Sequence, residues 1–549
     1  MRKNRIVLVL LLLVFIFSII FPLNVTACKD IVACGDATAG EYNLFLKVRD
    51  PSRPDFQVLC IVPEGYEYTY HYPWTGLPLK SKTYHKSIGV ASVNDVIPNI
   101  VKAGMAFTSA GIAYGDADTD SKWVNPTKHA WDDFDWLRYS FEKANTEDEA
   151  VNLLTIDAVK KMHATGVSEN LFVVGPKKGY VIEADAFHYK IKEITNGVSV
   201  MTNYPNELWR TQILNKLPYA SSFDIVKEEY VKKGRALRLN SFYGIRVVDI
   251  GSDFIIARQV PFLKITSNGI IKGPLVEIKI GERQTVGMYS VELKAIDRNQ
   301  AKVILCNKYK AWEDRMNDYI QNEYGSITIE DMINWSRLHE DDLDGLRPMC
   351  QDNSIYEAVM IYKIPRNYYD ILSCGWFSAN HACSSIFVPV HICNIDIFDP
   401  YENGDAAALS LELLARFGHN NLSSFFRKAE HVFLYENDLK EQISKTIITN
   451  TSEVSNLLTD VDMAMQYQAW LTQQIWFETS NISDWEIKQE VIDIIDDIWC
   501  ENYSVSLICM ENSISLLENV SGYAPEIDFI INKIQQIMIS INEINMIKL

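Results

Sequence analysis

The sequence predicts an α+β protein in which a strand-rich region comes first and an all-helical region follows. Apolar, β-rich runs recur from residue 28 to about residue 400, and the clearest two, 171–174 and 180–184, flank a Gly/Pro turn. These runs are nearly continuous rather than alternating, so their strands need cover on both faces. After about Asp405 the strand pattern gives way to helical periodicity. We therefore divide the chain into residues 1–27, 28–400 and 401–549.

Composition places the chain among ordinary globular proteins and excludes some partners. It has 549 residues, of which 48% are hydrophobic, and this length suffices for two or more domains with a large core. The formal net charge of −19 argues against nucleic acid or an anionic membrane surface as the main partner. The acidity by itself indicates no substrate preference.

Strands dominate the first half of residues 28–400. A hairpin is expected in 104–115 around Ser109-Ala-Gly111, and one helical stretch from Trp131 to Met162 has a second start at Thr146. Asn203 directly follows the last of these strands. The expected strands are 43–49, 56–62, 171–174, 180–184, 188–194 and 198–202, the last two extending one meander.

Helices and strands alternate more coarsely in the second half. Residues 221–240 are expected to be helical and carry Arg235 and Arg238, and a β-rich part follows at 247–306. A short helix near 329–339 precedes strands within 357–390. In the C-terminal region, helical periodicity predicts helices at 406–417, 462–479, 485–499 and 527–544.

The N-terminus has the three parts of a secretory signal. Arg2, Lys3 and Arg5 precede an unbroken apolar or small run over 6–21, and Val25-Thr26-Ala27 fits a cleavage site. We expect a signal peptide over residues 1–27 and an exported protein, extracellular or attached to the cell surface. An uncleaved run is long enough to anchor the chain in a membrane. The same residues followed by Cys28 also fit a lipoprotein site, at which Cys28 would carry lipid.

Cleavage would make Cys28 the first residue of the mature protein. One residue would then carry a thiol with an ordinary pKa of about 8.5 and an α-amine with one of about 7.7–8.0. These are a nucleophile and a base on one Cα. The chain has ten cysteines, and setting Cys28 aside leaves nine, so at least one stays unpaired in a monomer.

Motifs spread over residues 28–400 resemble one family. Cys28-Lys-Asp-Ile-Val-Ala-Cys-Gly, followed by Lys47-Val-Arg-Asp50, resembles the start of the cysteine N-terminal-nucleophile (Ntn) hydrolases. Within them the chain is most similar to the C69 dipeptidase family and more distantly to the penicillin V acylase and bile salt hydrolase group. Residues 170–184 and 197–203 are similar to the family's central hairpin and its strand ending in Asn, and 376–389 to its late region.

The resemblance implies both a fold and an activity. The fold would be a four-layer αββα sandwich, two stacked antiparallel sheets flanked by helices, which agrees with strands that need cover on both faces. The activity would be cleavage of an amide bond in a dipeptide or N-acyl amide through an acyl-enzyme on Cys28. Acyl transfer to an amine is an alternative within the same chemistry. The partner would be a small-molecule or short-peptide amide substrate, and we expect no cofactor and no metal ion.

The resemblance also assigns roles to charged residues near Cys28. Arg49 matches the family's arginine near the thiol, where a cation favours the thiolate over the thiol. The aspartate that orients the α-amine in the family corresponds to Ser52, and the nearby Asp50 is the expected substitute. A simple strand-end salt bridge is the alternative interpretation of Arg49.

Three further residues are candidates for the site. Asn203 matches an asparagine that donates a hydrogen bond to the developing oxyanion. A second donor is expected in the family's Asn-x-x-Gly hairpin, where this chain has Thr108. Arg235 resembles a later family arginine, and Arg238 lies one helical turn away in the predicted helix.

Other arrangements of cysteine and histidine compete with this interpretation. On strands, His381-Ala-Cys383 and His391-Ile-Cys393 would each place two metal-ligand types on one side, where the two pairs could converge on a metal. No Cys-x-x-Cys motif supports this alternative, and an exported cysteine more often pairs with another cysteine. Cys374 lacks the surrounding pattern of a papain-like nucleophile. A different class of protein is also consistent with the sequence, namely a surface lipoprotein or binding module with the same fold, lipidated at Cys28 and without catalysis.

Overall fold

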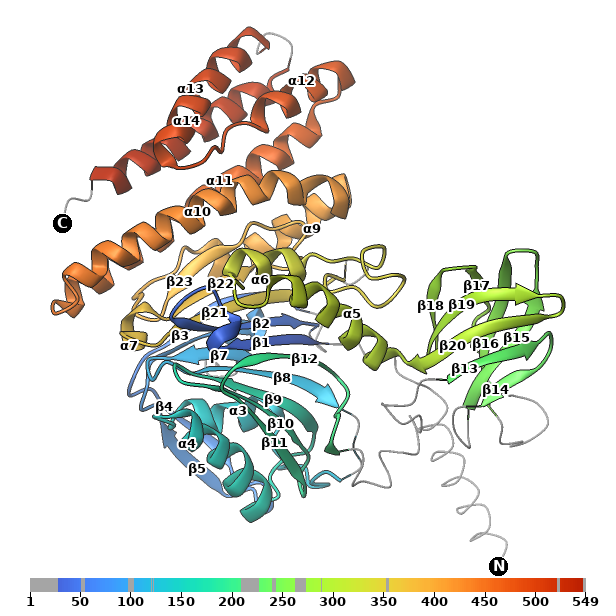
Figure 1. Cartoon of the computed structure of the whole chain (residues 1–549). Coiled ribbons are helices and arrows are strands. Elements are labelled where there is room, and N and C mark those ends of the chain that lie inside the picture. The colour runs from blue at the N-terminus through green and yellow to red at the C-terminus, as the bar shows by residue number, and fades with distance from the viewer. Residues whose placement is uncertain are drawn as a thin grey trace, which may run out of the picture.

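The structure is a computed structural model, shown in Figure 1. The predicted signal peptide and Ser52 lie outside the described residues. The residues that the structure describes are 28–50, 55–96, 103–119, 121, 123–208, 227–238, 243–261, 273–287, 289–351, 355–520 and 524–546.

The first sheet holds the strand that follows Cys28 in its interior. It has six antiparallel strands in the order β12-β1-β2-β21-β22-β23. Strand β1 pairs with β2 on one side and β12 on the other, so that Lys29 lies opposite both Val48 and Thr202. The strands span Gly197–Thr202 (β12), Lys29–Cys34 (β1), Tyr42–Arg49 (β2), Ala358–Pro365 (β21), Cys374–Ser378 (β22) and Val388–His391 (β23).

The second sheet contains the predicted hairpins. It has seven strands in the order β11-β10-β9-β8-β7-β6-β3. Strand β11 extends the central hairpin as predicted, but the prediction that 198–202 extends the same meander is wrong. Those residues form β12, where Val200 lies opposite Ile31 in the first sheet. The strands span Tyr189–Ile194 (β11), Gly179–Ala184 (β10), Ser168–Val174 (β9), Ala113–Thr119 (β8), Met105–Thr108 (β7), Ser87–Ser92 (β6) and Gln57–Val62 (β3).

Aromatic side chains hold the two sheets face to face. Phe45 of β2 stacks on Phe172 of β9 with ring centroids 5.4 Å apart, and the rings of Phe107 and Tyr362 are 5.5 Å apart. Gly115 of β8 allows this approach, because a Cβ there would come within 2.7 Å of the Phe45 ring. The sheets therefore lie close together at this point.

Helices cover the outer faces of both sheets and complete four layers (Figure 1). On the second sheet, Trp136 and Leu154 of this cover pack in one core with Tyr114. The predicted αββα sandwich is confirmed. The covering helices are α3 (Asp133–Phe141), α4 (Glu147–Asn152) and the π-helical η2 (Leu153–Lys161) on the second sheet, with α5 (Lys308–Glu323) and α6 (Ile329–Ser336) on the first.

Polar side chains fix where these helices begin. The Asp132 side chain accepts a hydrogen bond from the backbone N–H of Asp135 at the start of α3, and Thr146 accepts one from Glu149 at the start of α4. The second start predicted at Thr146 is therefore a separate helix. Thr328 forms a capping box at the start of α6.

A separate β unit lies between β12 and α5 (Figure 1, right). Its two four-stranded sheets have the orders β13-β20-β19-β18 and β14-β15-β16-β17 and enclose a core of their own. The predicted helix over 221–240 is wrong, because Val231 and Leu237 enter this core from strands; residues 221–226 and 239–240 lie outside the described part. The strands span Lys227–Lys232 (β13), Ala236–Arg238 (β14), Tyr243–Ile250 (β15), Phe254–Pro261 (β16), Val276–Lys279 (β17), Arg283–Val286 (β18), Tyr289–Asp297 (β19) and Gln300–Asn307 (β20).

The C-terminal region is helical, as predicted. The four predicted helices are present, and α10 and α13 are additional. In the part of the chain that the structure describes, no helix combines the length and the apolar character needed to span a membrane. The helices are α8 (Pro400–Asn403), α9 (Asp405–Phe417), α10 (His419–Thr446), α11 (Thr451–Asn481), α12 (Trp485–Ile495), α13 (Tyr503–Val520) and α14 (Glu526–Met546). Smaller elements elsewhere are η1 (Gly35–Ala37), β4 (Glu67–His71), β5 (Pro78–Lys82), α2 (Val93–Val96) and α7 (Tyr369–Leu372).

Buried charges attach the helical region to the first sheet. Lys363 Nζ on β21 lies 3.0 Å from Glu441 Oε2 on α10. His391 on β23 lies between two acids, with Nδ1 2.9 Å from Asp462 Oδ2 and Nε2 3.4 Å from Glu441 Oε1. Burial alone would raise the pKa of Glu441, but Lys363 and His391 lower it to about 2. The carboxylate therefore stays charged across the neutral range.

The depressed pKa of Glu441 predicts acid sensitivity of this attachment. Its stabilising contribution is complete above the ordinary pKa of 4.5 and is lost as the pH falls towards about 2. Glu441→Gln should lower the free energy of unfolding by about 3 kcal/mol near neutral pH, because Lys363 and His391 lose a shared anion. It should also flatten the pH dependence in the acid range. Urea unfolding followed by helical circular dichroism measures both effects.

A matched control is Glu412→Gln, which removes an exposed carboxylate 3.7 Å from Arg416 Nε on α9. It should change the free energy of unfolding by less than about 0.5 kcal/mol. Equal losses in the two variants would contradict a role for the buried network.

Candidate active site

Cys28 lies at the start of β1, between two neighbouring strands. Its carbonyl oxygen accepts a hydrogen bond of 3.0 Å from the Thr202 hydroxyl, and its exposed fraction is 8%. Because Lys29 lies opposite Val48 and Thr202, the next register position places Cys28 beside Arg49 on one side and Asn203 on the other. The structure therefore brings three of the predicted residues to one end of the first sheet.

The cation at the Cys28 thiol is Lys47, which the sequence analysis did not single out. Its side chain forms a hydrogen bond with the thiol and is completely buried. Lys47 Nζ lies 3.6 Å from Asp30 Oδ1 in its own sheet and 3.5 Å from Asp116 Oδ1 in the second sheet. The ammonium also donates to the backbone carbonyl of Asp116. Its stem passes over Gly115, where a Cβ would come 3.6 Å from Lys47 Cδ.

The charges around Cys28 act in opposite directions. Burial raises the pKa of the Cys28 thiol to about 11; Lys47 lowers it, while Asp116, Asp30 and Asp50 raise it. Burial alone would lower the pKa of Lys47, but Asp30, Cys28 and Asp116 raise it. Lys47 is therefore a permanent cation, and the thiol is neutral near pH 7. Thiolate chemistry at Cys28 needs a base.

Asp50 lies directly after β2 and is held by two partners. Lys29 Nζ is 3.4 Å from Asp50 Oδ2, and the Gln351 side chain donates a 2.6 Å hydrogen bond to the same oxygen. Lys29 also donates to the backbone carbonyl of Met349 at 3.1 Å. Asp50 is buried, and it acts on the Cys28 thiol through its charge. The loop around residue 350 thus fixes the acid that the sequence analysis placed near the thiol.

Arg49 contacts the second sheet. Its guanidinium donates to Gln57 Oε1 at 2.7 Å and to the backbone carbonyl of Val90 at 3.4 Å, and it lies 4.9 Å from the centre of the Phe134 ring. These partners commit Arg49 to a structural network beside the site. Lys47 and Arg49 share a face of β2 because residues i and i+2 of a strand do so. A lysine within an apolar strand, two residues before Arg49, was therefore the sequence signal that could have identified Lys47.

Asn203 is held over the second sheet by hydrogen bonds that cross between the sheets. Its side-chain amide donates to the backbone carbonyl of Asp118 at 2.7 Å, and it is 6% exposed. Asn170 of β9 donates to the carbonyls of Thr202 at 2.6 Å and Tyr204 at 3.2 Å. An amide NH₂ has two hydrogens, so one donor of Asn203 is not used by Asp118.

Thr108 does not lie at this end of the sandwich. Thr108 is the last residue of β7, and the residue before it, Phe107, pairs with Ala113 of β8. Asp118, which accepts the hydrogen bond from Asn203, lies five residues further along β8. At the usual strand rise this is about 17 Å. The structure therefore does not bring Thr108 to Cys28, because the hairpin turns at the opposite end of the sheet.

Arg235 is also separated from Cys28. It lies in the exposed turn between β13 and β14, where its backbone carbonyl accepts from Val247 within the separate β unit. Arg238 ends β14 in the same unit. The sequence pattern predicted a helix for these residues, but their strands pack in another core.

A pair of acids flanks the site on the second sheet. Asp118 and Glu169 lie directly opposite each other on β8 and β9, a like-charge pairing that is unfavourable when both are ionised. Glu169 is completely buried, and burial, followed by the charge of Asp118, raises its pKa well above its ordinary value. Burial and the neighbouring acid therefore favour the protonated form of Glu169.

The two His-x-Cys pairs do not converge. Among the described residues, His381 lies near Cys350 and Glu357, and Cys383 near His339 and Cys350. His391 instead contacts the Cys374 thiol and the Asp462 carboxylate, so that the imidazole lies between a thiol and an acid as in a Cys-His-Asp relay.

That relay is closed to substrate. Cys374, His391 and Asp462 are all completely buried beneath the helical region. Burial also raises the pKa of the Cys374 thiol. The papain-like alternative therefore has no accessible nucleophile at Cys374.

Comparison with known proteins adds one likeness. No family model matches the chain, and no curated protein matches it. Among solved structures, the chain is similar to penicillin V acylase from Agrobacterium tumefaciens, with 15% sequence identity and a TM-score of 0.26. The match covers 36% of this chain and 64% of the acylase, so the chain spans less than two thirds of that protein. The αββα sandwich assigned to this chain rests on its own layers and strand order.

Removing the Lys47 cation should make the Cys28 thiol less acidic. In Lys47→Met the thiol keeps its carboxylate neighbours but loses the cation, so its pKa should rise above about 11. One unit of pKa means a roughly tenfold lower thiolate fraction at a fixed pH. Peptide-resolved mass spectrometry of iodoacetamide labelling across a pH series measures this. Lys47→Arg keeps the charge and is the matched control; the same labelling profile in wild type and Lys47→Met would contradict the assignment.

Proposed function

We propose that this protein is an exported cysteine hydrolase that cleaves an amide bond through an acyl-enzyme on Cys28. One observation carries the proposal: Cys28 begins an interior strand of an αββα sandwich with the Lys47 cation at its thiol and Asn203 on the neighbouring strand end. The motifs favour the C69 dipeptidases as the subgroup. The substrate would then be a dipeptide or an N-acyl amide.

The proposed first step creates the thiolate. Removal of residues 1–27 frees the α-amine of Cys28, whose ordinary pKa of about 7.7–8.0 leaves roughly a tenth of it unprotonated at pH 7 and a larger share above that pH. The amine takes the proton of the thiol, directly or through one water. Lys47 stabilises the thiolate that forms, because its charge already lowers the pKa of the thiol. Asp50, fixed by Lys29 and Gln351, orients the resulting α-ammonium.

The second step transfers the acyl group. The thiolate attacks the amide carbon, and the side-chain N–H of Asn203 that Asp118 does not use donates to the oxyanion. The C–N bond then breaks, the leaving amine takes the proton from the α-ammonium, and a thioester remains on Cys28. Water hydrolyses the thioester to release the acid and restore the thiol. An amine in place of water would give acyl transfer instead.

A second candidate function is a lipidated surface protein without catalysis. Two observations favour it: Asp30, Asp50 and Asp116 outnumber the cation at the thiol, and Thr108 lies far from Cys28. Mass spectrometry of the mature N-terminus separates the two candidates. A free α-amine on Cys28 supports the enzyme, whereas a diacylglyceryl group on its sulfur excludes it.

Loss of the Cys28 sulfur should abolish turnover. Cys28→Ala should show no amine release from a panel of dipeptides and N-acyl amides, and Cys28→Ser should lose several orders of magnitude, because a hydroxyl is far less acidic than a thiol. Fluorescamine detection of the released amine measures both rates. Cys500→Ser, a half-buried cysteine in the helical region, is the matched control and should keep wild-type activity.

A chain that retains one residue before Cys28 should also be inactive, because its nitrogen is then an amide and no longer a base. Equal rates for this chain and the processed protein would exclude the N-terminal nucleophile mechanism. Such a result would instead indicate that a cysteine within the chain is the nucleophile.

Removing the proposed oxyanion donor should lower kcat. Asn203→Ala should reduce kcat by about 10²- to 10³-fold with a smaller change in KM, the usual effect of losing one such donor. Asn206→Ala is a control in the same loop, since its side chain contacts Glu313 and Met201. If the two variants lose activity equally, loop packing explains the loss and Asn203 is not a donor.

A further inference from the structure

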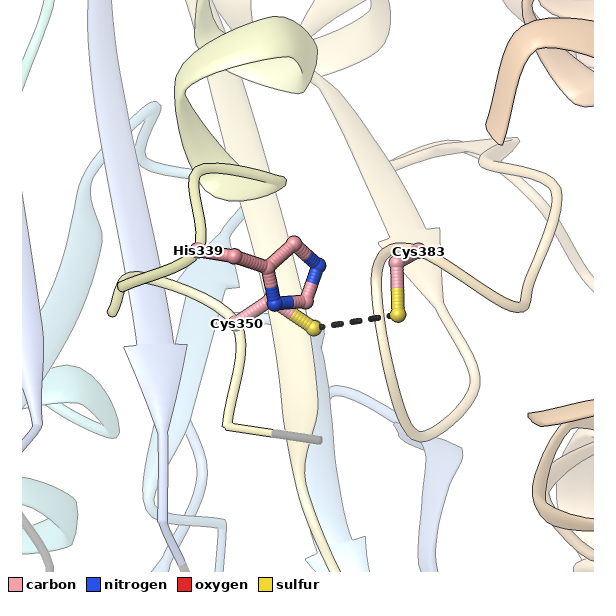
Figure 2. Close-up of side chains that lie close together, drawn as sticks. All are labelled: His339, Cys350 and Cys383. Carbon is pink, nitrogen blue, oxygen red and sulfur yellow. Dashed lines mark hydrogen bonds between the residues drawn. The ribbon is translucent and has the colours of Figure 1, made fainter. Parts of the chain in front are cut away.

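Three buried side chains with metal-binding atoms lie close together near the loop that contacts Lys29 and Asp50 (Figure 2). The ligand atoms of His339, Cys350 and Cys383 all lie within 4.8 Å of one another. The two sulfurs are 3.4 Å apart, and the imidazole of His339 lies beside them in Figure 2. Exposed fractions are 7% for His339, 0% for Cys350 and 1% for Cys383. Water has little access to the cluster.

The loops that carry these side chains are fixed by other contacts. Arg337, at the end of α6, donates to the carbonyl of Ala382 at 2.7 Å and to that of Ser385 at 3.1 Å. The same guanidinium binds both oxygens of Glu430 at 2.7 and 2.6 Å. The segment that contains Cys383 is thus tied to the helix that precedes His339. The hydrogen bonds of Arg337 therefore position the Cys383 sulfur without using any of the proposed ligand atoms.

The third side chain is held against the same segment. The backbone N–H groups of Met349 and Cys350 both donate to the carbonyl of Leu338, at 2.8 and 3.2 Å. Cys350 is therefore fixed next to the residue that precedes His339. The loop between α6 and β21, which carries His339 and Cys350, thus meets the loop between β22 and β23, which carries Cys383, and hydrogen bonds order both. Such preorganisation by neighbouring hydrogen bonds is typical of metal sites.

We propose that His339, Cys350 and Cys383 bind a thiophilic metal ion, with Zn²⁺ as the best match. Thiolate and imidazole are the ligands of zinc, and a tetrahedral site with Zn–S bonds of about 2.3 Å separates two sulfurs by roughly 3.8 Å. A small outward movement of the sulfurs from 3.4 Å meets this spacing. Binding would release the two thiol protons, so that two thiolates neutralise the charge of the ion in the buried site.

A disulfide between Cys350 and Cys383 is the competing outcome. It would require the sulfurs to approach to about 2.05 Å and would not use the imidazole. The presence of His339 at the same point favours the metal. In a second group, the ligand atoms of Cys350, Glu357 and His381 also lie within 4.8 Å of one another. Glu357 accepts the backbone N–H of Gln351 at 2.7 Å, which orders this side of the site.

The ion would brace the candidate active site without entering it. Cys350 lies between Met349, whose carbonyl accepts from Lys29, and Gln351, whose side chain donates to Asp50. Lys29 and Asp50 adjoin Cys28. Metal binding would therefore stiffen the loop that fixes Asp50, and the three ligands would be positioning residues for the reaction.

Metal content of the full-length purified protein tests the proposal. Mass-spectrometric metal analysis after growth with Zn²⁺ and dialysis should find about one zinc per wild-type chain, and Cys350→Ser, Cys383→Ser and His339→Ala should each retain less than about a tenth of it. Replacement by Co²⁺ should give the thiolate-to-cobalt charge-transfer band. This spectrum is read on the wild type, so the test stands even if a variant fails to fold.

The matched control removes another pair of cysteines. Cys500 and Cys509 lie near each other in the helical region, and the Cys500→Ser/Cys509→Ser variant should keep its zinc. Cys28→Ala should also keep it, which separates this proposal from the catalytic one. A wild-type chain without zinc or cobalt, a Cys350–Cys383 disulfide in non-reducing peptide maps, or zinc that survives all three ligand substitutions would each overturn the proposal.

Discussion

A lysine ammonium buried between two β-sheets is the interaction on which the site depends. A buried charge is costly unless it is paired, and Lys47 is paired by Asp30 from its own sheet and Asp116 from the other. The same cation contacts the Cys28 thiol. Any shift of one sheet against the other would separate this cation from one of its acids. The electrostatic environment of Cys28 therefore depends on how the two sheets are stacked.

The other side of Cys28 is ordered by uncharged groups. Asn170 and Asn203 make hydrogen bonds across the gap between the sheets, one from each sheet. The Thr202 hydroxyl completes this side by binding the Cys28 carbonyl. The charged Lys47 on β2 therefore acts on the thiol of Cys28, whereas the hydrogen bond from Thr202 on β12 fixes its backbone. The two kinds of interaction respond differently to pH, because only the first includes titratable groups.

The fold was more predictable from the sequence than the site. Continuous apolar strands require cover on both faces, and this local property led to the layered sandwich. The position of Thr108 depends on which end of a sheet a hairpin turns towards, and no local pattern records that. Lys47 was missed because its partner Asp116 belongs to the other sheet. His339 and Cys350 lie on the loop between α6 and β21, and Cys383 lies on the loop between β22 and β23, so their convergence has no signature in sequence spacing.

The pairing of β1 with β12 bears on the proposed cleavage before Cys28. The Thr202 hydroxyl that binds the Cys28 carbonyl is 174 residues further along the chain, so this contact forms only after a long segment has been synthesised. In the folded chain Cys28 is 8% exposed. If the chain is processed at this point as we propose, a peptidase would reach the bond more easily before β12 docks than after. The yield of processed protein would then depend on the rate of cleavage relative to the rate at which β12 docks.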